Sequence, residues 1–207
     1  MGLIATNAIK PFPRRKGRPT YELAALFPPQ GFWSESDYLD LDTERWVELS
    51  NGFLEVLPMP SEAHQDIVLF LVEALKAFVL AHNAGKVLMT GLRVKLWDGT
   101  IREPDVVFMS AEHYVRREEY WLGADLVMEV VSPGGRERDL VEKRYQYAKA
   151  GISEYWIVDP RKKQITVLKL QGERYVEHGI FKSGSVASSA LLKGLSVDVA
   201  AVFAAAE

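Results

Sequence analysis

The sequence predicts a mixed α/β (α+β) fold, in which a central β-sheet is flanked by helices. Short apolar runs that are typical of strands alternate with two segments of helical periodicity. Turn residues at 51–52 and 98–100 each join two such runs, so part of the sheet is antiparallel. The runs 125–132 and 152–159 are apolar on both faces apart from single polar positions, which is typical of strands in the middle of a sheet.

The first half of the chain predicts a hairpin, a helix and a second hairpin. Segment 45–58 forms two short strands around its Asn-Gly turn. Ser61 is a suitable N-cap for a long amphipathic helix over 62–83. The apolar stripe of this helix consists of Ile67, Val68, Leu71, Leu75 and Phe78. Segments 86–97 and 101–110 then form a second hairpin of longer strands.

The second half predicts a central strand, a helix and another central strand. The helix spans 137–150 and ends at Gly151, which suits a C-cap. An antiparallel β extension follows, and a short helix closes the chain. The extension consists of 163–170, 174–181 and 182–192, and the closing helix of 196–205.

Composition narrows the class of protein. The 207 residues include no cysteine, which excludes disulfides and thiolate metal sites. The net charge of −3 excludes a polycation built as a whole for nucleic acid, although a local basic face stays open. No apolar run approaches the roughly 20 residues needed to cross a bilayer, so no membrane partner is expected. The N-terminus lacks the layout of a signal peptide, and we expect a cytoplasmic protein.

The chain is expected to divide into an N-terminal arm, residues 1–30, and a single domain, residues 31–207. The arm holds five prolines, and it has five basic residues between Lys10 and Arg18. This composition favours an extended, solvated tail. A strap along a phosphate backbone is the alternative, which the lack of interleaved aromatic residues disfavours.

Two carboxylates stand in otherwise apolar strands, Asp105 in segment 101–110 and Glu129 in segment 125–132. An ionised carboxylate is costly to bury unless it is paired. If the two strands are neighbours, the acids converge and repel each other unless a cation lies between them. A divalent cation with oxygen ligands, Mg²⁺ above all, resolves that conflict. An ion pair with Arg102 or Arg93 is the alternative for either acid alone.

The helix over 137–150 carries Asp139, Lys143 and Tyr147 four residues apart, so these side chains share one helix face. A lone Asp–Lys pair at this spacing is by default a weak surface salt bridge. Here the helix begins just after the strand of Glu129. A lysine on its inward face can therefore reach the two carboxylates.

The segments "PDVVF", "LVMEVVSP" and "RDLVEKRYQYAKAGISEYWIVDP" resemble the Uma2-type restriction endonuclease family, formerly a domain of unknown function. This family belongs to the PD-(D/E)xK nuclease superfamily, and the similarity runs from about Trp33 to Phe203. The resemblance implies a restriction-endonuclease-like core. It also implies an Mg²⁺- or Mn²⁺-dependent endonuclease that cleaves nucleic acid, with DNA as the expected substrate. Many nucleases of this fold form homodimers to cut both strands, although this sequence shows no coiled-coil or other interface pattern.

Each motif position of the family has a counterpart in this sequence. Pro104-Asp105 matches the "PD", and Glu129 matches the acidic residue of "(D/E)xK". The lysine position of that motif is Val131, which is a departure from the pattern. The resemblance implies that Lys143 of the following helix replaces the lysine, and that Glu48 supplies a further acidic residue.

The resemblance also suggests the remaining members of the site. Asp105 and Glu129 would bind the metal together with the backbone carbonyl of Val130. His64 opens the long helix; a packed helix-end histidine and a site histidine are equally open interpretations.

Two other functions remain open on the sequence. A catalytically silent nuclease fold that binds nucleic acid or a protein partner is favoured by Val131 and by the acidic balance of the chain. A metal-dependent hydrolase of small phosphoesters is the second. Arg136 and Arg138, beside the proposed site, either contact phosphates or are solvated.

Overall fold

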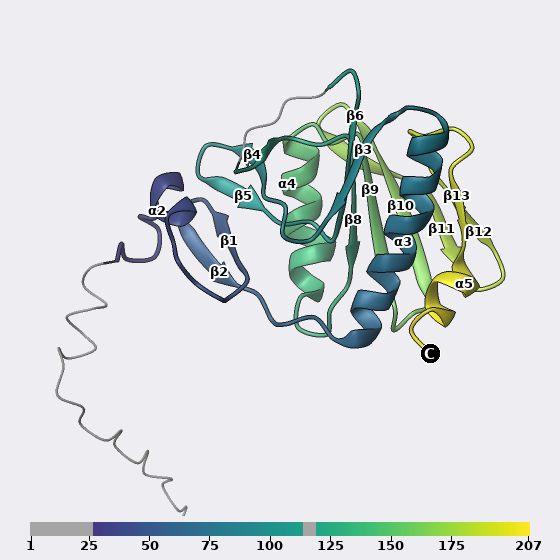
Figure 1. The fold of residues 1–207 in the computed structure, drawn as a ribbon, viewed down its shortest axis with the longest axis horizontal. Helices are drawn as coiled ribbons and strands as arrows, with labels where there is room; N and C mark the ends of the chain where they lie inside the picture. Colours follow the sequence, from purple (N-terminus) through teal and green to yellow (C-terminus); the bar gives the residue numbers. More distant parts are fainter. Residues whose placement is uncertain (1–26, 114–118) are drawn as a thin grey trace, which may run out of the picture.

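The computed structural model describes residues 27–113 and 119–207, and Figure 1 shows their course. The expected basic arm lies outside the described residues up to position 26. Within the two described ranges, no helix is long and apolar enough to cross a membrane. The first helix within the described residues is α2 (Glu35–Leu39), a short element that the sequence analysis did not anticipate.

A five-stranded mixed sheet, here called sheet A, occupies one end of the molecule (Figure 1). Its strands in order are β2 (Phe53–Val56), β1 (Val47–Ser50), β5 (Thr100–Arg102), β4 (Val94–Trp97) and β7 (Trp121–Leu122). Only β4 and β7 run parallel. The hairpin predicted at Asn51-Gly52 is confirmed, since β1 pairs with β2 and both turn residues have positive φ, 48° and 81°.

A six-stranded mixed sheet, sheet B, forms the middle of the molecule. Its strands in order are β11 (Arg174–Lys182), β10 (Gln164–Gln171), β9 (Glu154–Asp159), β8 (Leu126–Val130), β6 (Val106–Ser110) and β3 (Gly85–Met89). Strands β8 and β9 are parallel, and the other neighbours are antiparallel. The two predicted central strands and the antiparallel pairing of β9, β10 and β11 are therefore confirmed.

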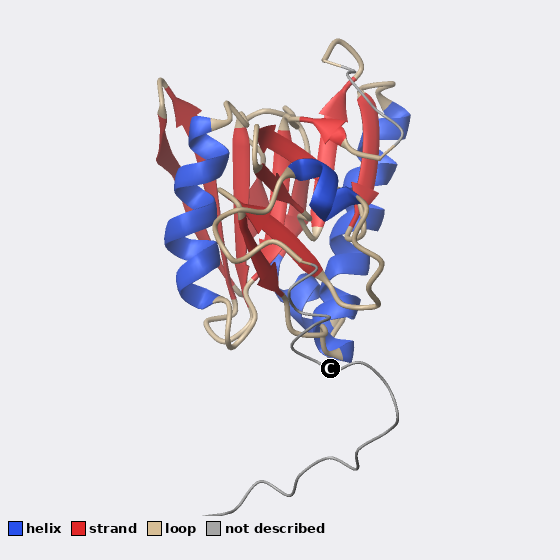
Figure 2. Cartoon of the chain, turned by 90° about the vertical axis from the view of Figure 1, so that its left-hand side faces the viewer, coloured by secondary structure: helices blue, strands red, loops and turns tan. Residues whose placement is uncertain are grey.

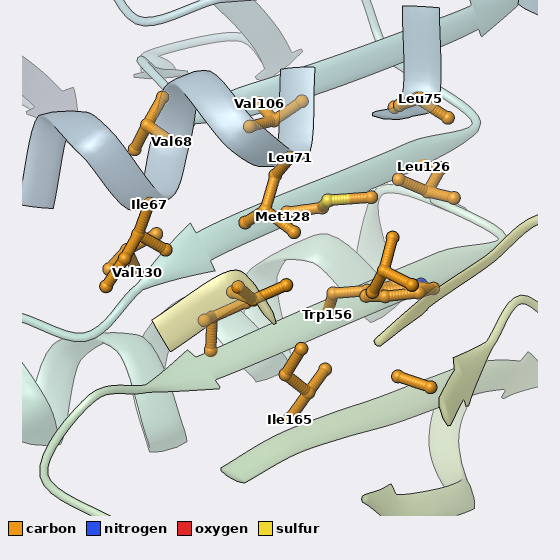
Figure 3. Packing of buried hydrophobic residues seen from close by; sticks show 14 of the residues in the cluster. Ile67, Val68, Leu71, Leu75, Val106, Leu126, Met128, Val130, Trp156 and Ile165 are labelled. Atoms are coloured by element: carbon orange, nitrogen blue, oxygen red, sulfur yellow. The ribbon is translucent and has the colours of Figure 1, made fainter. Parts of the chain in front are cut away.

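Helices cover both faces of sheet B, as Figure 2 shows from the side. Helix α3 (Glu62–Ala81) begins at its predicted cap, because the Ser61 hydroxyl accepts a hydrogen bond from the His64 N–H at 3.3 Å. Its apolar stripe packs against alternate residues of β6, β8 and β9, including Val106, Met128 and Trp156 (Figure 3). The other face of these strands packs against α4 (Lys143–Lys149).

The crossover from β8 to the parallel strand β9 contains one irregular helical turn. It runs through a π-helical turn, η1 (Arg138–Glu142), into α4. The predicted end of this helix at Gly151 is confirmed by its φ of 80°. The wider π turn was not expected, and such turns often occur at functional sites.

The second predicted hairpin is wrong as a single unit. Strands β4 and β5 pair in sheet A, whereas β3 and β6 pair in sheet B. Residues 90–93 and 103–105 carry the chain from one sheet to the other. Pro104 has no N–H for a strand ladder, and Gly91 adopts a φ of 96°, so neither arm continues as one strand. The protein therefore has two mixed sheets where one central sheet was predicted.

The C-terminal segment also departs from the prediction. Strand β12 (Val186–Ser188) does not extend sheet B, and it pairs with β13 (Ser196–Asp198) in a separate two-stranded sheet. The closing helix α5 is confirmed only over Val199–Ala204. It begins after Asp198, whose side chain accepts a hydrogen bond from the Ala201 N–H at 2.8 Å.

Candidate active site

Asp105 and Glu129 lie at the ends of two neighbouring strands. Strands β6 and β8 are antiparallel, with Val106 opposite Met128. Asp105 directly precedes β6 and Glu129 directly follows Met128, so the register places the two acids opposite each other. Asp105 is held from two directions: its Oδ2 accepts a hydrogen bond from the Val130 N–H at 2.7 Å, and its Oδ1 is 3.2 Å from Nε2 of His64. The expectation that the two strands are neighbours is confirmed, and His64 lies beside the acids.

Lys143 points inward from α4 and is 2% exposed. Its Nζ lies 2.8 Å from Oε1 of Glu129 and 3.3 Å from Oε1 of Glu48. Tyr147, one turn later, donates its hydroxyl hydrogen to the same Glu129 oxygen at 2.5 Å. A solvent-exposed salt bridge on the helix surface is therefore excluded for this lysine.

Val131 occupies the position at which the family motif has its lysine. The side chain of Val131 belongs to the apolar cluster between sheet B and α4. Val131 also lines the cleft described below, and the ammonium group that reaches Glu129 comes from Lys143 of α4.

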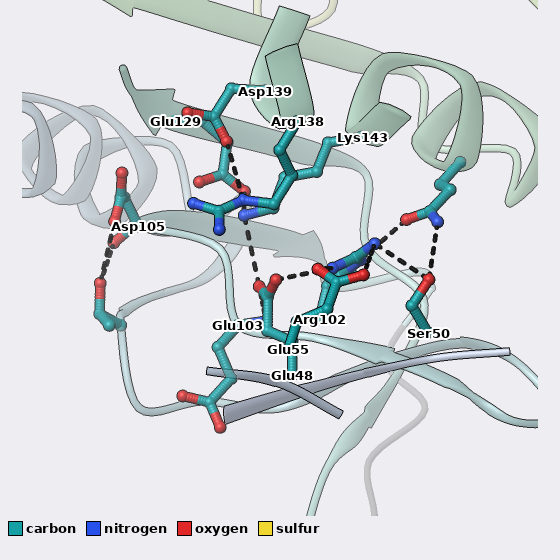
Figure 4. Close-up of polar contacts among 12 residues, drawn as sticks. Glu48, Ser50, Glu55, Arg102, Glu103, Asp105, Glu129, Arg138, Asp139 and Lys143 are labelled. Carbon is teal, nitrogen blue, oxygen red and sulfur yellow. Dashed lines mark hydrogen bonds and ion pairs between the residues drawn. The ribbon is translucent and has the colours of Figure 1, made fainter. Parts of the chain in front are cut away.

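Glu48 connects sheet A to this group. It is fully buried on β1, its Oε1 accepts a hydrogen bond from the Glu103 N–H at 2.9 Å, and its Oε2 accepts one from Arg102 at 2.8 Å. Arg102 thus pairs with Glu48, and the idea that it partners Asp105 or Glu129 is wrong. Arg102 also contacts Glu142 and Gln146. Figure 4 shows it beside Glu48, Glu55 and Ser50. The sequence analysis missed this network, for which a basic residue inside the apolar segment 101–110 was the only signal.

Burial and charge shift the pKa values of the site in different directions. Burial raises the pKa of Glu129; Lys143 opposes the rise, and Asp105 and Asp139 add to it. Burial would also raise the pKa of Glu48, but Lys143 and Arg102 outweigh it and lower that pKa to about 2. The site thus holds one carboxylate with firm charge partners and one with a deficit of positive charge.

Two opposing effects act on the pKa of Lys143, and the negative charges of the two glutamates outweigh burial. Desolvation alone would lower the pKa of Lys143, whereas Glu129 and Glu48 raise it above its ordinary value. Asp139, 3% exposed at the start of the helix, has a pKa raised by burial although Lys143 opposes the rise. Lys143 therefore stays positively charged, whereas Glu129 and Asp139 bind protons more readily than an ordinary carboxylate.

A cleft of about 670 Å³ opens over these groups. Its polar lining includes His64, Glu103, Asp105, Glu129, Arg138, Asp139 and Lys143, and its apolar wall includes Trp46, Leu57 and Met59. Figure 4 shows the Arg138 side chain extending between Glu129 and Glu48. Arg136 does not line this cleft; its Nη1 is 2.7 Å from Asp159, in a separate hollow of about 210 Å³.

The residues present fit a cation with oxygen ligands. No cluster of three or more His, Asp or Glu side chains spaced as metal ligands occurs in residues 27–113 and 119–207. The donors are instead two carboxylates and one carbonyl. The N–H and C=O of a strand residue point to the same side, so the Val130 carbonyl faces Asp105 as its N–H does. Oε2 of Glu129 accepts no hydrogen bond from any described residue, so it is available as a ligand.

The two mixed sheets, with Asp105 and Glu129 on neighbouring strands and a lysine from the next helix, define an α/β protein with an acidic cleft that contains a buried lysine. The chain belongs to the Uma2 family, whose model, described as "Putative restriction endonuclease", matches residues 35–200. The predicted family is confirmed.

One solved structure shows the same fold. It comes from Anabaena variabilis and is described as "a putative nuclease belonging to DUF820". Its TM-score is 0.72 at 18% sequence identity, and the match covers 84% of this chain and 99% of that one. No curated protein matches the chain significantly.

Proposed function

We propose that the chain is a metal-dependent endonuclease that hydrolyses phosphodiester bonds in nucleic acid, with DNA as its substrate. One observation carries the proposal: a buried lysine from the helix after β8 contacts Glu129, next to Asp105, on the wall of a cleft. Family membership supports the reaction class. Residues 31–207 would form the single nuclease domain, with sheet B, α3 and α4 as its restriction-endonuclease-like core.

Mg²⁺ or Mn²⁺ would be held by Asp105, Glu129 and the carbonyl of Val130. When bound, the cation supplies positive charge that polarises a phosphodiester and makes water a better nucleophile. The raised pKa of Glu129 supports this assignment, because a buried acid short of positive charge favours a bound cation.

The protein side chains supply orientation and charge. Lys143 would stabilise the negative charge that develops on the phosphate, or orient the attacking water, with an ammonium group fixed by Glu129 and Glu48. Tyr147 fixes the orientation of Glu129, and His64 fixes that of Asp105. These contacts hold the reacting groups before substrate arrives.

A plasmid-nicking assay tests the proposal. We expect the purified protein to convert supercoiled DNA to the nicked form with Mg²⁺ or Mn²⁺ and not with EDTA. Asp105→Asn and Glu129→Gln should abolish nicking, because a neutral amide is a poor ligand for a hard cation. Glu173→Gln, in the exposed turn between β10 and β11, is the matched control. Linear product would indicate that both strands are cut, as expected of a homodimer.

Other outcomes would favour the alternative functions. Absence of metal-dependent nicking on DNA and RNA would contradict the endonuclease proposal. Binding of an oligonucleotide without cleavage would indicate a catalytically silent fold. Hydrolysis of a chromogenic phosphodiester, with no action on DNA, would indicate a hydrolase of small phosphoesters.

A further inference from the structure

Two polar groups on the wall of the cleft have no hydrogen-bond partner among the described residues. They are Nε of Arg138 and Oγ of Ser132, and both atoms are buried. The Arg138 side chain as a whole is 21% exposed, and its one ion pair, with Asp139, is a contact of 3.6 Å without a hydrogen bond. Buried polar groups are nearly always paired in native proteins. This corner of the cleft therefore offers donors to a ligand.

The two groups gather around Gly135. A Cβ atom on Gly135 would lie 2.6 Å from Oγ of Ser132 and 2.7 Å from Nη2 of Arg138. Any side chain at this position would therefore displace one of them. The φ of Gly135 is not positive, so its backbone does not demand glycine, and the crowding comes from these neighbours. The absence of a side chain at Gly135 therefore lets the Ser132 hydroxyl and the Arg138 guanidinium lie close together, beside Oδ2 of Asp139, which would be 3.2 Å from the same Cβ atom.

The turn that carries these residues follows directly on Glu129. It is closed by hydrogen bonds from the Gly135 N–H to the Ser132 carbonyl at 3.2 Å and from the Asp139 N–H to the Gly135 carbonyl at 2.9 Å. It therefore joins the carboxyl end of β8 to the start of the next helix. Ligands of α/β proteins typically bind at such strand ends.

We propose that Arg138 and Ser132 form a phosphate subsite, which holds a phosphate of the nucleic acid beside the paired acids; the assignment of the substrate rests on the proposed function. A guanidinium group forms two parallel hydrogen bonds with a phosphate, and a hydroxyl adds a third. Arg136 does not share this role, because Asp159 binds it in the other hollow.

Calorimetric titration of the full chain with inorganic phosphate, in EDTA, tests the subsite directly. We expect the wild type to bind phosphate, and Arg138→Gln and Ser132→Ala each to weaken binding about tenfold. Gly135→Ala should weaken it too, because the added methyl group displaces the Ser132 hydroxyl or the Arg138 guanidinium. Arg144→Gln is the charge-matched control, since Arg144 is exposed on the outer side of the same helix. Thermal unfolding verifies that each variant is folded.

A second readout uses a labelled DNA oligonucleotide in EDTA. Loss of one phosphate contact should lower the slope of log K against log salt by about one for Arg138→Gln and leave it unchanged for Arg144→Gln. Equal phosphate affinity in wild type and Arg138→Gln, or an equal loss in Arg144→Gln, would overturn the inference. Nicking by the wild type would in that case still support the endonuclease proposal. Phosphate binding that depends on Arg138 without nicking would uphold the subsite and reject the nuclease.

Discussion

At the scale of single residues, Lys143 is the cation that neutralises the buried glutamates of the candidate site. It is buried between Glu129 and Glu48, at 2.8 and 3.3 Å. Removing one partner of a buried ion pair leaves an uncompensated charge. We expect Lys143→Met to lower the free energy of unfolding by about 3 to 5 kcal/mol.

Urea denaturation measures this effect, with Lys76→Met on the exposed side of α3 as control. The control should change stability by no more than about 0.5 kcal/mol. Adding Glu129→Gln to Lys143→Met should recover part of the loss at a pH above the raised pKa of Glu129, where the carboxylate is ionised and the double variant buries one charge fewer. If the two losses instead add in full, the pair does not interact as described.

The pKa of Glu129 makes a second prediction at this scale. Burial raises it above the ordinary value of 4.5, so the folded state binds this proton more tightly than the unfolded state. The resulting stabilisation is fully present below pH 4.5 and is lost as the pH rises through the raised pKa. We therefore expect the unfolding free energy of the metal-free wild type to fall over this range relative to that of Glu129→Gln.

Metal should change this pH dependence. A cation binds the ionised carboxylate, so its affinity should rise with pH and its binding should release protons. Calorimetry in buffers of different ionisation enthalpy measures the proton release, and Glu129→Gln should abolish it. Parallel stability profiles of wild type and Glu129→Gln would contradict the raised pKa.

At the scale of elements, the sequence predicted the helices, strands and turns that are determined by residues close together in the chain. The Asn51-Gly52 hairpin, helix α3 and the strands β8 to β11 follow from turn chemistry and periodicity. The division of 86–110 between two sheets does not: Pro104 and Gly91 mark where each arm is interrupted, but they do not indicate which strands the resulting pieces pair with. Lys143 and Tyr147 were predictable from their helical spacing, whereas Arg102 bonds to partners 40 to 54 residues away.

Glu154 provides a prediction for one element, the loop after β12. This buried carboxylate at the start of β9 accepts hydrogen bonds from Trp156, Ser189 and the N–H groups of Ala190 and Leu191, at 2.6 to 2.7 Å. Glu154→Gln replaces an acceptor oxygen with a donor. We expect it to lower the free energy of unfolding by about 2 to 4 kcal/mol.

Thermal or urea unfolding measures the loss, with Glu177→Gln, exposed on β11, as control. Glu154 lies at the end of β9 away from the cleft, so Mg²⁺ affinity should be unchanged. A variant as stable as the wild type would show that the carboxylate does not hold the loop.

At the scale of the whole molecule, the candidate site spans the junction of the two sheets. Sheet A contributes Glu48, and sheet B contributes Glu129 with the acid that precedes β6. Arg102 joins these parts: fully buried on β5, it pairs with Glu48 of β1, Glu55 of β2 and Glu142 of η1, at 2.8, 2.6 and 2.8 Å. Sheet A and the helix that carries Lys143 are thus tied through one guanidinium.

Arg102→Met tests this connection. Three acids lose their shared partner, so we expect a loss of about 3 to 5 kcal/mol and amide exchange that quickens more in β1 and β2 than in β8 and β9. Lys95→Met is the control, because Lys95 pairs with Glu35 and Asp98 nearer the surface of sheet A and should lose about 1 kcal/mol or less. Equal acceleration of amide exchange in both sheets would mean that Arg102 stabilises the fold as a whole. Faster exchange in sheet A alone, together with weaker Mg²⁺ binding, would show that Arg102 aligns Glu48 with Lys143 across the junction.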